Sequence, residues 1–422
     1  MVPRTSGHVR SRMVVRSLKP VLAALVALYC AALMPVGAST PAAERDAVGQ
    51  VADEIVLDEM LRATGIHNVL EREALVATIR LEIDTLIDRF DGREPSYRRA
   101  RRIHTILHEK FLGEYDPAAD GLQQVVREGR YNCLSASLLY GLVLRQLGYR
   151  PQIIETPGHL FVSLRIGERV IYVETTASLG FDIDPRIATG GVGPWARATD
   201  ENGRRLSRSA RDEAQVWPVR VDQAAGFAWI NSAWKAMEAG RPLEAAASVR
   251  RAERFLPEMA RRAEGVNMLL SQAFREAYDA GDFEAAQEIG RIGLEIYPGS
   301  TSAEDRMLAA AHKRIEIVCA ANRPMDAAKI VDELQALQID GFQLQGLIRS
   351  IGPTIVMSAA RNCHWDLARH NAERYALAEP DSLLTGRLWD WLELRRSRSR
   401  TLSEGVCLET LTSRRPLASF RR

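Results

Sequence analysis

A chain of 422 residues is too long for one ordinary hydrophobic core, and a typical domain size of about 150 residues predicts two or three units. Its 46% hydrophobic and 26% charged residues are typical of a globular protein. Five of the 56 basic residues and none of the 54 acidic ones lie in the first 38 positions, which leaves 51 basic against 54 acidic residues. This balance gives no reason to expect nucleic acid or anionic lipid as a partner.

Residues 1–38 resemble a secretory signal peptide in the order of their parts. A basic stretch ends at Lys19, an apolar run covers residues 21–34, and small residues at 36–38 offer a cleavage site. The apolar run is shorter than the roughly 20 residues of a membrane-spanning helix, although an uncleaved anchor is the alternative. We therefore expect a periplasmic or secreted protein with no stable membrane span after signal removal.

Residues 39–115 are predicted to be helical, because apolar residues recur there at three- and four-residue spacing. His104 and His108 stand four apart on the third of these helices, a spacing that suits two metal ligands. No third ligand is evident, so a structural histidine pair is the better interpretation. The sequence predicts no metal and no cofactor.

The pattern changes in residues 116–185. A polar loop at 129–132 precedes an apolar helix that begins at Cys133 and ends at Gly148. Three strand-like segments follow, at residues 152–155, 159–165 and 169–176. Residues 186–225, rich in glycine and polar side chains, are predicted to be a connection that packs around the first domain.

Three residues of this region could do chemistry together. Cys133 lies in the first turn of a helix, where unpaired backbone N–H groups and the helix dipole favour a thiolate. His159 begins a strand and could take a proton from a thiol. Each has an ordinary alternative, since a cysteine can be a small core residue and a histidine at a strand start can be structural.

Glu174 strengthens the catalytic hypothesis. If Ile166 and Gly167 form a two-residue hairpin turn, His159 faces Glu174 across the two strands, and the carboxylate can orient the imidazole. A different turn would shift the pairing by two, place Thr176 opposite His159 and leave Glu174 diagonal to it. In both registers one face of the hairpin is apolar and would pack on the core, through Leu160, Val162, Leu164, Ile171 and Val173.

These segments resemble the transglutaminase-like superfamily, in particular a compact bacterial branch in which the core precedes tetratricopeptide repeats. The resemblance covers residues 116–180 and is carried by Gly129-Arg130-Tyr131-Asn132-Cys133-Leu134-Ser135, Leu147-Gly148-Tyr149, Pro157-Gly158-His159-Leu160-Phe161-Val162 and Val173-Glu174-Thr175-Thr176.

The resemblance implies a papain-like α+β domain with a Cys–His–acid triad. Cys133 matches the nucleophile, His159 the base and Glu174 the third member, where the family more often has aspartate. For the oxyanion, the Cys133 backbone N–H is a natural donor at the helix start. The sequence leaves the second donor open among Gln123, Gln124, Tyr131 and Asn132.

Residues 226–385 repeat a turn followed by an acidic residue and small apolar residues. The recurring triplets lie 40, 42 and 40 residues apart, at Glu244-Ala245-Ala246, Glu284-Ala285-Ala286, Asp326-Ala327-Ala328 and Asp366-Leu367-Ala368. The pattern resembles tetratricopeptide repeats, in which stacked helix pairs expose an extended surface for a protein or peptide partner. Residues 386–422 are predicted to be the end of a helix and a basic tail. Cys319 and Cys363, about one repeat apart, are the cysteines best placed for a disulfide.

The sequence thus predicts an α+β thiol domain followed by an all-α repeat domain. We expect an exported thiol enzyme that hydrolyses an amide or peptide bond, because no site for a second amine is evident. The alternative is a catalytically silent domain in a repeat-based protein-binding scaffold.

Overall fold

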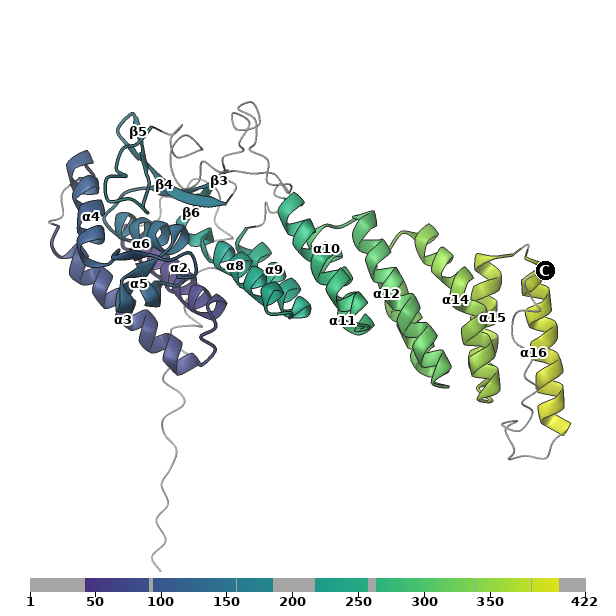
Figure 1. The fold of residues 1–422 in the computed structure, drawn as a ribbon. Helices are drawn as coiled ribbons and strands as arrows, with labels where there is room; N and C mark the ends of the chain where they lie inside the picture. Colours follow the sequence, from purple (N-terminus) through teal and green to yellow (C-terminus); the bar gives the residue numbers. More distant parts are fainter. Residues whose placement is uncertain are drawn as a thin grey trace, which may run out of the picture. The chain divides into compact units, whose positions relative to one another are not determined.

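The computed structural model describes residues 42–90, 94–156, 158–184, 217–256, 263–337, 339–380 and 382–401. The chain divides into two compact units, residues 1–225 and 226–422. The predicted signal peptide, most of the predicted connection and the basic tail lie outside the described residues. The described chain is mostly helical, with one small sheet region in the first unit (Figure 1).

The first unit contains helices packed around a small sheet. Its helices are α2 (Ala42–Ala63), α3 (Val69–Ile87), α4 (Tyr97–Lys110), α5 (Leu122–Glu128) and α6 (Cys133–Gln146), with a 3-10 turn, η3 (Val221–Gln223). Helix α6 packs on strands β3 (Pro151–Thr156) and β4 (His159–Ile166), and most of its residues are buried. The predicted stop is observed, because Gly148 follows the helix in a left-handed conformation with φ of 83°.

The main sheet has four antiparallel strands in the order β5-β4-β3-β6, in which β5 is Arg169–Val173 and β6 is Trp217–Arg220. Strand β6 lies in the segment that we predicted to be a connection, so that prediction is wrong for its last residues. A single strand of four residues containing Pro218 gives a weak sequence signal, and a proline is tolerated here because β6 is an edge strand of the sheet that the described residues form.

A second departure lies just before Cys133. The predicted loop at 129–132 contains strand β2 (Arg130–Tyr131), which pairs in parallel with β1 (Glu114–Tyr115). The two-stranded pairing brings Tyr115 beside Tyr131. Two-residue strands have no periodicity that sequence analysis could detect.

The β4–β5 hairpin has the second of the two registers considered above. Ile166 pairs with Arg169, so the turn residues are Gly167 and Glu168 rather than Ile166 and Gly167. Gly167 adopts φ of 60° at the first turn position, which a β-branched isoleucine would resist. A shift of two keeps every side chain on its predicted face, and the five apolar residues named for the core are all buried.

The second unit consists of successive antiparallel helices (Figure 1). They are α8 (Ala225–Glu238), α9 (Pro242–Phe255), α10 (Ala263–Asp279), α11 (Phe283–Ile296), α12 (Thr301–Ala320), α13 (Pro324–Ala336), α14 (Gly341–Arg361), α15 (Trp365–Ala378) and α16 (Leu383–Thr401). The alanines of the repeated triplets are buried at the start of the second helix of each pair, as at Ala246, Ala286 and Ala327. Their small size allows neighbouring helices to approach closely.

The turns inside the helix pairs are repeated with a constant period. Gly240, Gly281, Asn322 and Cys363 all have φ between 59° and 78°, and each follows the last by 41 residues. In every case the next residue donates its N–H to a carbonyl five positions back, as Arg241 does to Ala236.

The predicted disulfide between Cys319 and Cys363 is wrong. Cys319 is a buried free thiol on α12, and Cys363 is disulfide-bonded to a different residue. In the constant 41-residue period Cys363 corresponds to Asn322 and not to Cys319, so the two cysteines occupy different places in their helix pairs, Cys319 in α12 and Cys363 in the turn after α14. None of the described helices is long and apolar enough to cross a membrane.

Candidate functional site

The Cys133 thiol lies at the first residue of α6 and is partly exposed and free. Asn132 caps this helix, because its Oδ1 accepts hydrogen bonds from the N–H groups of Leu134 at 2.9 Å and Ser135 at 3.0 Å. The Ala136 N–H donates to the Asn132 carbonyl. Of the backbone N–H groups in this first turn, that of Cys133 has no acceptor among the described residues. This N–H belongs to the same residue as the sulfur.

His159 and Glu174 meet at the end of the β4–β5 hairpin. His159 Nε2 lies 2.6 Å from Glu174 Oε2, and both side chains are largely buried. Since β5 ends at Val173, Glu174 stands just beyond the ladder, diagonal to His159. Diagonal neighbours remain within reach of long side chains, and the methylene by which glutamate exceeds aspartate bridges this offset.

Burial and hydrogen bonding oppose each other at His159. Burial alone would lower the pKa of its imidazole, but hydrogen bonds with the Cys133 and Glu174 side chains, together with their charges, raise it to about 9. Because Glu174 occupies Nε2, Nδ1 is the ring nitrogen available to the sulfur. At Glu174 burial would raise the pKa, yet hydrogen bonds from His159 and Thr176 hold it below its usual value. The imidazole and the carboxylate thus form a hydrogen-bonded pair, and the Cys133 thiol interacts electrostatically with the imidazole.

The loop after β5 fixes the carboxylate. Thr176 donates both its N–H, at 3.0 Å, and its hydroxyl to Glu174 Oε1. The loop then turns tightly, with the Glu174 N–H bonded to the Gly180 carbonyl. A Cβ on Gly180 would lie 2.1 Å from the Glu174 carbonyl oxygen, so this turn requires glycine.

Ser137 connects the nucleophile helix to the same loop. It lies one helical turn after Cys133, and its hydroxyl is 2.8 Å from the Thr175 hydroxyl. Ser137 and Thr175 are both almost completely buried. This bond ties the helix that carries the sulfur to the residue next to Glu174, so helix and loop cannot shift independently without breaking it.

His104 and His108 of α4 lie next to the loop that follows β5. The rings of His104 and His108 are 4.7 Å apart, and burial lowers the pKa of His104 to about 4 and also lowers that of His108. The backbones of Glu174 and Thr175 are their respective hydrogen-bond neighbours. In the described part of the chain no group of three or more His, Cys, Asp or Glu residues could hold a metal ion. The contacts of both rings with the backbone of residues 174 and 175 fit a structural role for the pair.

The four candidates for the second oxyanion donor have other partners. The side-chain amides of Gln123 and Asn132 donate to Thr64 Oγ1 and the Pro117 carbonyl, both at 3.1 Å. Gln124 caps α5 by accepting from the Gly121 N–H, and the Tyr131 hydroxyl donates to the Thr176 carbonyl at 3.2 Å.

Sequence analysis did not identify Tyr115 as a residue of the site. Burial, together with the neighbouring charges of Cys133 and Glu174, raises the pKa of its hydroxyl to about 12. Its ring packs edge-on against Tyr131, with centroids 5.8 Å apart. The only available sequence signal was an aromatic residue in the polar stretch before Asp116, which is too common to single out.

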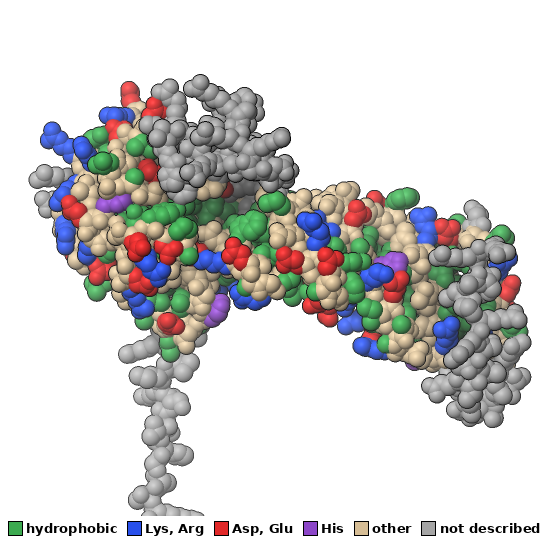
Figure 2. All heavy atoms as spheres, in the orientation of Figure 1, with side chains coloured by type: hydrophobic (Ala, Val, Ile, Leu, Met, Phe, Trp, Pro, Cys, Tyr) green, Lys and Arg blue, Asp and Glu red, His purple; other side chains and the backbone are tan. Residues whose placement is uncertain are grey.

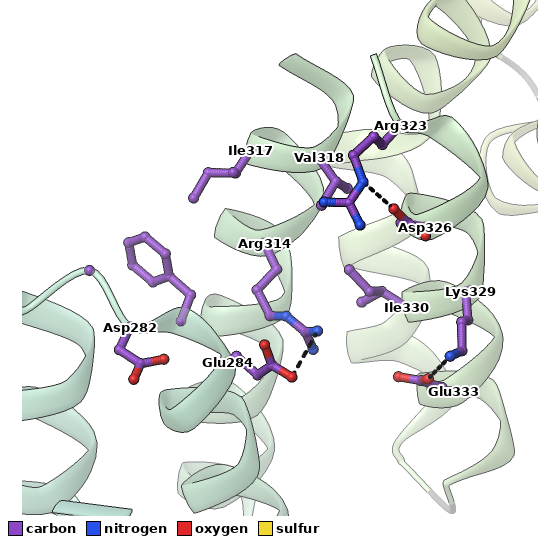
Figure 3. Close-up of a pocket in the computed structure, with 12 residues that line it drawn as sticks. Asp282, Glu284, Arg314, Ile317, Val318, Arg323, Asp326, Lys329, Ile330 and Glu333 are labelled. Atoms are coloured by element: carbon purple, nitrogen blue, oxygen red, sulfur yellow. Dashed lines mark ion pairs between the residues drawn. The ribbon is translucent and has the colours of Figure 1, made fainter. Parts of the chain in front are cut away.

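The repeat unit has a separate cavity of about 430 Å³ between the start of α11, the end of α12 and α13. Figure 3 shows oppositely charged pairs among its side chains, with Arg314 directed at Glu284, Arg323 at Asp326 and Lys329 at Glu333. Acidic and basic side chains are likewise interspersed over the face of the repeat helices seen in Figure 2. The cavity is thus a polar recess of mixed charge.

Comparisons with known proteins do not identify a family. No family model matches the chain, and no curated protein matches it. Among solved structures, menin, whose structure is described as revealing the binding site for the Mixed Lineage Leukemia (MLL) protein, is 11% identical over 84% of this chain and 86% of its own, with a TM-score of 0.29. A likeness at this level carries no argument about fold or function.

Proposed function

We propose that the first unit is a transglutaminase-like thiol hydrolase that cleaves an amide or peptide bond through Cys133, His159 and Glu174. The observation that carries the proposal is the hydrogen-bonded pair of His159 and Glu174, with the Cys133 thiol as the neighbour that interacts with the imidazole. A carboxylate 2.6 Å from one nitrogen of a buried imidazole leaves the other nitrogen for a sulfur at a helix start. This is the arrangement that activates a thiol nucleophile.

The reaction would begin with transfer of the Cys133 thiol proton to the imidazole of His159, whose raised pKa of about 9 favours the imidazolium. The sulfur adds to the substrate carbonyl carbon, and the C–N bond breaks as His159 gives its proton to the departing amine. Water then attacks the thioester while His159 takes a proton from it, which releases the acid and restores the thiolate and imidazolium. Glu174 stays ionised and stabilises the imidazolium in both stages.

The second unit would bind the protein or peptide partner. Stacked helix pairs expose a long surface, and the mixed-charge recess beside α13 offers both carboxylates and cations for a polar segment. Export to the periplasm or outside of the cell is part of the proposal and rests on residues 1–38 alone.

The test is the reactivity of Cys133 towards iodoacetamide at neutral pH, followed by mass spectrometry of the labelled peptides. We expect Cys133 to be alkylated faster than a small model thiol and faster than Cys319, whose pKa burial raises to about 11. His159→Ala should slow the Cys133 reaction, and Cys319 labelling should not change.

The enzymatic proposal would be wrong if Cys133 were alkylated at the same rate as the model thiol and His159→Ala left that rate unchanged. The repeat-based binding scaffold with a silent thiol domain would then be the better account. If the rate depends on His159, mass-spectrometric identification of peptides acylated onto Cys133 follows, with Cys133→Ser as the control.

A further inference from the structure

We propose that the Tyr115 hydroxyl is the second hydrogen-bond donor of the site and acts, together with the Cys133 backbone N–H, on the oxygen of a carbonyl substrate. The inference rests on the proposed function and deepens it, because it restricts the site to substrates that pass through an oxyanion. As the S–C bond forms, the carbonyl π bond breaks and its electron pair moves to oxygen. Two donors that already face that oxygen stabilise it at the moment of reaction.

The backbone fixes Tyr115 next to the nucleophile. Tyr115 pairs with Tyr131, which lies two residues before Cys133. On either side of Tyr115, the Glu114 N–H donates to the Gly129 carbonyl at 3.0 Å and the Asp116 N–H to the Tyr131 carbonyl at 2.8 Å. The position of Tyr115 relative to the start of α6 is therefore set by a hydrogen-bonded ladder and not by a loose loop.

The ring of Tyr115 is also held in place. Its contact with Tyr131 is nearly perpendicular, at 85°, which is a favourable arrangement for two aromatic rings. Tyr131 is itself anchored, because it is buried and its hydroxyl donates to the Thr176 carbonyl. Tyr115 thus packs against Tyr131, and Tyr131 also contacts the loop that carries Glu174.

The Tyr115 hydroxyl is also linked to the site through electrostatics. The residue as a whole is 37% exposed, yet its hydroxyl is desolvated and interacts electrostatically with Cys133 and Glu174. A partly exposed tyrosine that is held beside the start of α6 can meet a substrate carbonyl that approaches Cys133. The phenol remains protonated at neutral pH, so it can donate a hydrogen bond to an anionic oxygen.

The test compares two reactions of the same sulfur in Tyr115→Phe, which keeps the ring and removes only the hydroxyl. Acylation by p-nitrophenyl acetate passes through an oxyanion, whereas alkylation by iodoacetamide displaces iodide at a saturated carbon and does not. We expect the acylation rate to fall about 100-fold, the usual effect of losing one such donor. The alkylation rate should stay unchanged, which also shows that the site is folded.

Tyr278→Phe is the matched control, because this ring packs against Phe274 and Phe283 in the repeat unit, away from Cys133 in the sequence and in a different unit. It should change neither rate. Equal losses in both reactions of Tyr115→Phe, or a loss in neither, would overturn the inference while the proposed function stands. If the wild-type protein is not acylated at Cys133 at all, the proposed function fails and the inference fails with it.

Discussion

His159 Nε2 lies 2.6 Å from Glu174 Oε2 although the two residues are not cross-strand partners, since the hairpin register would place Thr176 opposite His159. Thr176 instead turns back and donates to the other carboxylate oxygen of Glu174. Thr176 therefore orients the Glu174 carboxylate, and the carboxylate in turn orients the His159 imidazole. Four predictions follow from this arrangement and from the turns of the repeats.

Glu174→Gln should lower the pKa of the His159 imidazole from its value of about 9, because the substitution removes the negative charge that favours the imidazolium. The measurement is NMR titration of the imidazole Cε1–H signals, with His159 assigned from its absence in His159→Gln. Because the folded pKa is raised, the stabilisation by this group is fully present below about pH 6.5 and is lost as pH rises through about 9. A wild-type midpoint near 6.5 would contradict the hydrogen-bonded pair.

Ser137→Ala and Thr175→Val should each destabilise the first unit by roughly 1–3 kcal/mol, because each leaves a buried hydroxyl without its partner. The double variant should lose less than the sum of the two, since it removes both hydroxyls together. Denaturant unfolding of the four proteins gives the coupling energy. Strict additivity would show that the bond does not connect α6 to the loop.

Gly180→Ala should disturb the acid loop, because the new Cβ would lie 2.1 Å from the Glu174 carbonyl oxygen. We expect a loss of about 1–3 kcal/mol in stability and a slower, less His159-dependent alkylation of Cys133. Gly346→Ala in α14 is the control, since a Cβ there meets nothing within 4 Å and alanine favours the helix. An alkylation rate equal to wild type in Gly180→Ala would show that the loop tolerates the shift.

Asn322→Val should weaken the turn between α12 and α13, because valine at φ of 59° costs about 1–2 kcal/mol that asparagine and glycine largely avoid. Asn322→Gly should leave local stability intact. Hydrogen-exchange mass spectrometry of peptides from both helices distinguishes the two variants. Equal protection in Asn322→Val and in the wild type would contradict the left-handed assignment.

Long, regular features were predictable from sequence, and short ones were not. The start of α6 at Cys133, the apolar face of the hairpin and the buried alanines of the repeats follow from periodicities of 3.6 and 2 and from turn residues. Strand β6 and the β1–β2 pair have only a few residues each and depend on distant partners for their hydrogen bonds. Such pairing is a property of the whole fold.

The same contrast holds for the site. His159 and Glu174 lie within hydrogen-bond distance, through a hairpin register set by Gly167 in the turn. Their role with Cys133 stays a prediction. Tyr115 could not be found because it reaches the site through β1, which has no sequence signature. In the repeats, Cys319 and Cys363 were paired by spacing alone, and spacing does not report the direction of a side chain.

The left-handed turns recur at Gly240, Gly281, Asn322 and Cys363 with no insertion or deletion between them. Because the turns recur at a constant spacing, each repeat between two turns is an interchangeable module. Excision of residues 282–322 would join Gly281 to Arg323 and leave a chemically equivalent corner, so the array could be shortened by one module without designing a new linker. The length of the surface that we propose to bind a partner could then be varied in whole repeats while the first unit stays the same.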